Sequence, residues 1–184
     1  MSPSPEFAVF AGRAARAREE LTGLLDVVPD GEWVRQAPGN AWDIHTHVAH
    51  VAAADAAAAD LFAALSSSPG VLPLAESLAR FAESRAAAIA EARTRTPTAL
   101  RTLIAHQREA ALQALVSLPP AAFDTSLLLP GGGAWGQDLT FSLRSYLATW
   151  AAHDLEHAAA IRAALLVAPS PSAMALAARL RRAR

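Results

Sequence analysis

Four segments of about twenty residues dominate the sequence, and in each of them apolar residues return every third or fourth position. The pattern is clearest in the second segment, where Ile44, Val48, Val51, Ala58, Leu61, Phe62 and Leu65 recur at this spacing. Such spacing places these side chains on one face of an α-helix, whereas a half-buried strand would require strict alternation. The sequence therefore predicts an all-α protein built from amphipathic helices that bury their apolar faces against one another.

Turn-forming residues set the limits of the predicted helices. Residues 5–25, 43–66, 97–117 and 138–167 are expected to form an up-down-down-up type four-helix bundle. Residues 74–93 are expected to form an extra connecting helix, and residues 170–184 a short C-terminal basic helix. No strand is predicted. Residues 1–184 are interpreted as a single domain, with its core at about residues 5–166.

Composition excludes several classes of site and partner. The chain has no cysteine, so a metal site must use histidine and carboxylate ligands. A net charge of −1 argues against nucleic-acid binding. The longest apolar stretch, residues 48–65, contains His50, Asp55 and Asp60, so no membrane span is expected. No signal peptide is recognised at the N-terminus, and a cytoplasmic location is expected.

The histidines carry the strongest chemical signal. His153 and His157 are four residues apart on an apolar stripe of the last long helix, so both imidazoles can face one ion. The alternative is a pair of buried histidines that are hydrogen-bonded to their neighbours. A zinc peptidase is not favoured, because Asp154 stands where the zincin motif needs glutamate.

The second helix can supply a third ligand. His47 and His50 are three residues apart and can point to the same side. Three imidazole ligands would leave open coordination positions, as in catalytic metal sites. His47 could instead contact a ligand histidine, move a proton, line the pocket or simply be a buried histidine.

With this arrangement of histidines, the chain resembles the DinB/YfiT-like superfamily of metal-binding four-helix bundles. The matching positions, in the order and spacing typical of that family, are Trp42, Asp43, His50, His153, Asp154, His157 and Ile161. The resemblance implies that His50, His153 and His157 bind a divalent transition metal, with zinc or nickel expected first and iron also considered. The chain departs from the family pattern at Thr46, where the family usually has Glu or Gln, and at Ala160, where it often has Gln.

The same resemblance implies an enzymatic function. Related proteins include S-transferases that use low-molecular-weight thiols and a thiol-dependent maleylpyruvate isomerase. We therefore expect a transferase or isomerase acting on a small electrophile with a thiol cosubstrate, in a homodimer. Metal-hydroxide hydrolysis is an alternative, with His47 or Asp154 as the base. A non-catalytic metal- or ligand-binding bundle with a role in the stress response is the other class considered.

Two carboxylates and one indole are also expected near the site. Asp55 and Asp154 could orient the ligand imidazoles by accepting their second ring proton. Trp135, in the glycine-rich loop before the last long helix, could cover the pocket or anchor the loop.

Overall fold

The computed structural model describes residues 5–67, 72–73, 86–87, 89–129 and 137–166. Within these ranges the longest elements are the helices α1 (Pro5–Asp26), α2 (Ile44–Ser67), α4 (Pro97–Val116) and α5 (Leu143–Leu166). Two short 3-10 helices, η1 (Asp30–Glu32) and η2 (Pro120–Asp124), lie in the connections. The expected all-α bundle is confirmed, and its helices begin and end close to the predicted residues.

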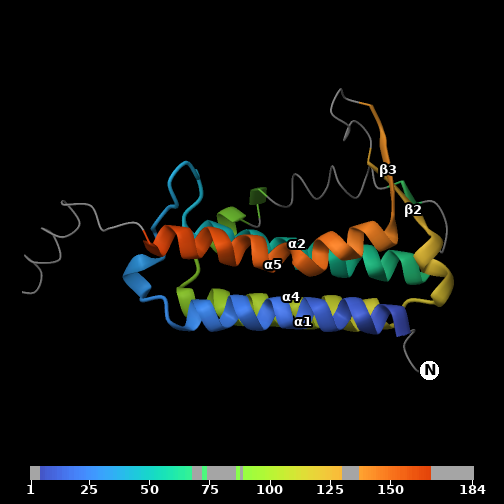
Figure 1. Ribbon diagram of the computed structural model, residues 1–184, viewed down its shortest axis with the longest axis horizontal. Coiled ribbons are helices and arrows are strands. Elements are labelled where there is room, and N and C mark those ends of the chain that lie inside the picture. The colour runs from blue at the N-terminus through green and yellow to red at the C-terminus, as the bar shows by residue number, and fades with distance from the viewer. Residues whose placement is uncertain (1–4, 68–71, 74–85, 88, 130–136, 167–184) are drawn as a thin grey trace, which may run out of the picture.

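The four long helices pack in the predicted up-down-down-up order (Figure 1). Ion pairs from Glu6 to Arg144 and from Glu20 to Arg162 show that α1 and α5 run in the same direction. The largest interfaces are α2 with α4 and α1 with α5. Helices α2 and α5 run in opposite directions, so the beginning of α2 lies beside the end of α5.

Two of the predicted helix starts are confirmed by their side-chain caps. The Asp43 carboxylate accepts a hydrogen bond from the backbone N–H of Thr46 at 2.7 Å. The Thr96 hydroxyl accepts one from the backbone N–H of Ala99, and Pro97 occupies the first turn of α4. Both caps satisfy an N–H group that has no partner within its own helix.

A small sheet lies at one end of the bundle, and the prediction of no strands was wrong. Strand β2 (Ser126–Leu129) pairs in parallel with β1 (Leu72–Pro73) and antiparallel with β3 (Leu139–Ser142). Strand β3 replaces the predicted first turn of the last helix, so α5 begins at Leu143. Strands of two to four residues are too short for periodicity to identify, and β1 pairs with a strand that lies far away in sequence.

Other predicted features lie wholly or partly outside the described residues. Of the connecting helix expected at 74–93, residues 86–87 and 89–92 are described and are helical. The C-terminal helix expected at 170–184 and the proposed covering residue Trp135 fall outside.

The buried residues form two apolar clusters, one toward each half of the bundle. One contains Phe7, Phe62, Leu115 and Leu147, and the other contains Leu21, Val48, Ile104 and Ile161. By length and composition alone α2 could cross a membrane, but 61% of the relevant window is buried inside the bundle. A mostly buried apolar helix is what the core of a globular protein requires.

A charged layer separates the two apolar clusters. Each long helix contributes one buried charged residue at this level, namely Arg18, Asp55, Arg108 and Asp154. These four side chains pair with one another across the centre of the bundle.

Candidate metal centre

The three histidines expected to bind metal converge on one point between α2 and α5. The Nε2 atom of His153 lies 3.2 Å from Nε2 of His50 and 3.0 Å from Nε2 of His157. Nitrogen ligands about 2.05 Å from a tetrahedral zinc ion would be about 3.3 Å apart. The spacing therefore fits a single ion, and the three residues form a group that could hold one.

Helix direction and helix geometry explain this convergence. His153 and His157 lie one turn apart on α5, so their rings project toward the same side. His50 is in the second turn of α2, and the opposite direction of the two helices brings it beside the end of α5. His157 is buried, whereas His50 and His153 are half-buried, so the point of convergence lies at the edge of the bundle.

Burial favours the neutral form of His47, His153 and His157. Burial and the neighbouring histidines lower the pKa of His157 to about 2. Burial also lowers the pKa of His153 and of His47. Neutral imidazoles retain a lone pair on one ring nitrogen, which is the form that binds a metal ion.

His47 touches a candidate ligand rather than the point of convergence. Its Nδ1 atom lies 2.8 Å from Nδ1 of His157, on the side of that ring away from His153. Its Nε2 atom lies 3.1 Å from Nδ2 of Asn40. Of the roles considered for His47, this geometry supports contact with a ligand histidine.

The loop before α2 closes over this cluster. Pro38 and Gly39 occupy the central positions of a turn in which the backbone N–H of Asn40 bonds to the carbonyl of Ala37 at 3.0 Å. Gly39 has a φ of 73°, as the third residue of a type II turn requires. The indole of Trp42 stacks parallel to the His157 ring at a centroid distance of 6.3 Å. The loop thus brings both Asn40 and Trp42 to the histidines.

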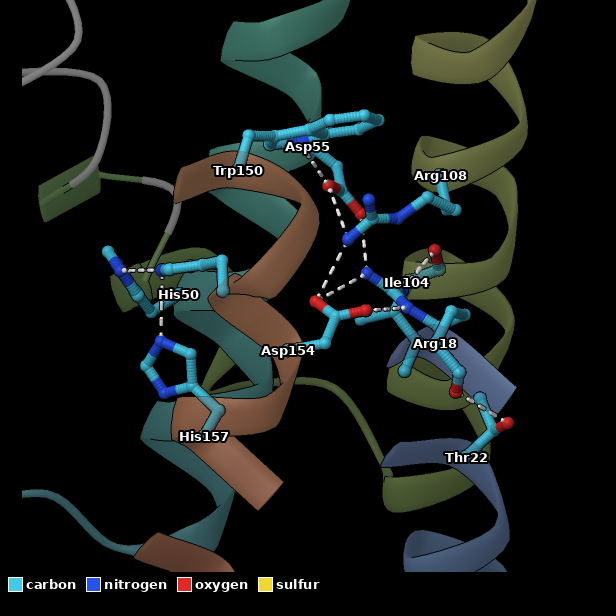
Figure 2. A network of polar contacts seen from close by, with 10 residues as sticks. Arg18, Thr22, His50, Asp55, Ile104, Arg108, Trp150, Asp154 and His157 are labelled. Carbon is cyan, nitrogen blue, oxygen red and sulfur yellow. Dashed lines mark hydrogen bonds and ion pairs between the residues drawn. The ribbon is translucent and has the colours of Figure 1, made fainter. Parts of the chain in front are cut away.

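Asp154, which was expected to act as a catalytic base, lies outside the histidine cluster. Figure 2 shows its carboxylate on the other side of α5, facing α1 and α4. There it accepts hydrogen bonds from Arg18 and Arg108 and is fully buried. Asp55 also belongs to this layer and binds both arginines and the indole N–H of Trp150. Neither carboxylate orients a ligand imidazole as expected.

The partners of these carboxylates, Arg18 and Arg108, were not predicted from the sequence. Arg108 occupies a position between Ile104 and Ala111 on the apolar stripe of α4, and its guanidinium lies 4.3 Å from the centre of the Trp150 ring. Arg18 similarly interrupts the buried face of α1 between Ala14 and Leu21. An arginine at a core position was the available signal. The missed Asn40 had no comparable signal, because a loop asparagine is common in turns.

Comparisons with known proteins agree with this architecture. The sequence profile of the DinB superfamily matches residues 13–161. Among solved structures, the fold is similar to that of a mycothiol-dependent maleylpyruvate isomerase, with a TM-score of 0.65 and 21% identity. It is also similar to a histidine-to-alanine mutant of that isomerase, with a TM-score of 0.64 and 20% identity.

The two structural matches cover most of this chain but only part of the isomerase. Each structural alignment covers 84% of this chain but 60% of the isomerase chain, so the present chain spans about 60% of that protein's length. No curated protein matches the sequence. At this level of identity the two structures show a common fold.

Proposed function

The chain belongs to the DinB superfamily, and from that premise we propose that it is a thiol-dependent enzyme whose metal ion is bound by His50, His153 and His157. The observation that carries the proposal is the convergence of three Nε2 atoms from two helices. An all-imidazole donor set suits zinc or nickel, and also iron. Three protein ligands would leave a coordination position open for a substrate.

The donor set, the composition and the similarity in fold together support the proposed reaction class. A bound divalent ion would favour the thiolate form of a coordinated thiol, which is the nucleophilic form. The chain has no cysteine, so the thiol must come from a cosubstrate. The fold-level similarity to a mycothiol-dependent maleylpyruvate isomerase supports a thiol-dependent isomerisation or S-transfer on a small electrophile.

The residues around the ion have distinct proposed roles. His47 bonds to His157 and would position that ligand. The Trp42 ring lies against His50 and His157, with a centroid distance of 4.9 Å to His50, and would shield one side of the site from water. Asp154 has no role at the metal in this proposal, because two arginines already bind its carboxylate.

Metal content is the first prediction of this proposal. Untagged protein is expected to contain about one equivalent of a transition metal, and His153→Ala is expected to lose it, because two imidazoles hold an ion much more weakly than three. Elemental analysis of both proteins measures this directly. His106→Ala is the matched control, because His106 is an exposed histidine on α4 and its loss should leave the metal content unchanged. Protein that neither contains nor takes up zinc, nickel or iron would refute the proposal.

Thiol binding is the second prediction. Cobalt(II)-substituted protein should develop a near-ultraviolet thiolate-to-cobalt absorption band when a low-molecular-weight thiol such as mycothiol is added, and its alcohol analogue should produce none. The band reports a sulfur–metal bond and does not depend on the acceptor substrate. If the protein binds metal but thiols never change its spectrum, the thiol-dependent function is wrong. A metal-dependent hydrolase and a non-catalytic metal-binding bundle would then be the remaining hypotheses.

A further inference from the structure

The orientation of the Asn40 side chain follows from one backbone contact. The backbone N–H of Trp42 lies 2.9 Å from a terminal atom of the Asn40 amide. A backbone N–H can only donate, so that atom must be the carbonyl oxygen Oδ1. The amide nitrogen Nδ2 is then the atom that faces Nε2 of His47 at 3.1 Å. Asn40 therefore donates to His47, and Nε2 of His47 is an acceptor.

This hydrogen-bond direction continues through His47 to His157. A neutral imidazole carries one proton, so His47 with an accepting Nε2 must carry its proton on Nδ1. That proton points to Nδ1 of His157, 2.8 Å away, which must accept it. The proton of His157 is then on Nε2, directed at Nε2 of His153 at 3.0 Å. In this arrangement a proton occupies the nitrogen that should bind the metal.

Metal binding requires the opposite arrangement. A neutral His157 that binds an ion through Nε2 carries its proton on Nδ1 and needs an acceptor there. His47 would have to accept through Nδ1 and carry its own proton on Nε2. That proton would face the amide nitrogen of Asn40 at 3.1 Å. Two N–H donors would then point at each other with no acceptor between them. The conflict disappears if the Asn40 amide turns over, but Trp42 N–H then loses its acceptor.

We propose that Asn40, acting through His47, decides which nitrogen of His157 carries the proton and thereby weakens metal binding until the Asn40 amide turns over. The inference rests on the proposed metal site. Asn40 and His47 are positioning residues, because neither reaches the point of convergence. Metal binding would in this way be coupled to the loop that carries Trp42 over the site.

The substitution Asn40→Asp tests this coupling. A carboxylate only accepts, so Asp at this position can accept from Trp42 N–H and from a proton on Nε2 of His47 together. We expect zinc to bind about tenfold more tightly, within the range seen when partners of metal-bound histidines are changed. Equilibrium competition with a chelator measures the dissociation constant, and circular dichroism checks that each variant is folded.

A double-mutant cycle separates the relay from the added charge. In a His47→Leu background, Asn40→Asp can no longer act through His47, so its effect on zinc affinity should vanish. An equal gain in both backgrounds would show that only the negative charge acts, and would overturn the inference. No gain in the His47 background would overturn it as well.

A measurement without metal distinguishes this inference from the proposed function. Long-range ¹H–¹⁵N correlation spectra of the metal-free protein report which ring nitrogen of each histidine carries the proton. We expect Nδ1–H for His47 and Nε2–H for His157, with both reversed in Asn40→Asp. A proton on Nδ1 of His157 in the wild type would overturn the inference alone. Wild-type protein that binds no zinc would overturn the proposed metal site and this inference together.

Discussion

Replacing Asp154 with asparagine is expected to lower the free energy of unfolding by about 3–5 kcal/mol, the usual cost of removing one partner from a buried ion pair. The Asp154 carboxylate is fully buried and lies 2.7 Å from Nε of Arg18 and 2.9 Å from Nη2 of Arg108. Asparagine has nearly the same shape but no charge, so Asp55 alone would face two buried guanidinium groups. The cost comes from the positive charge that is then left uncompensated and away from water.

Urea denaturation of the wild type and the variant measures this difference. Glu20→Gln is the matched control. Glu20 pairs with Arg162 between α1 and α5, the helices that carry Arg18 and Asp154, and both side chains of this pair are nearly half exposed. Loss of that pair should cost less than about 1 kcal/mol. If Asp154→Asn costs no more than Glu20→Gln, Asp154 does not compensate the buried charge of Arg18 and Arg108.

The metal-free protein is expected to lose stability as the pH falls below about 6.5, the unperturbed pKa of histidine. Burial and the nearby histidines lower the pKa of His157 to about 2 in the folded state. Between these two values the unfolded chain binds a proton that the folded protein does not, so a fall in pH favours unfolding. His157 alone contributes a loss of about 1 kcal/mol between pH 6.5 and 5.5. His153 and His47, whose pKa values are also lowered, act in the same direction.

Urea denaturation at a series of pH values, with a chelator present, tests this dependence. Other groups also titrate in this range, so the informative quantity is the difference between the wild type and His157→Leu. Leucine does not titrate, and stability should therefore fall less steeply with acidification in the variant. Parallel stability curves for the two proteins would contradict the lowered pKa of His157.

The helices were predictable because the information for them is local. Apolar spacing marks the buried face of a helix, and capping residues such as Asp43 and Thr96 act within one turn. The pairing of His153 with His157 is local in the same way, since it follows from the pitch of one helix. His50 was assigned through the family resemblance, and the structure brings it to the other two histidines.

What only the tertiary structure decided is how each helix is rotated against its neighbours. Asp154 follows His153 directly, yet a rotation of about 100° per residue turns its carboxylate toward α1 and α4 and away from the histidines. Its partners Arg18 and Arg108 are 136 and 46 residues away in sequence. The contact of Asn40 with the side chain of His47 likewise depends on how the loop closes onto α2, whereas its bond to the backbone N–H of Trp42 is local. Spacing along one helix shows which residues can act together, but a side chain's partner is set by packing between segments that are distant in sequence.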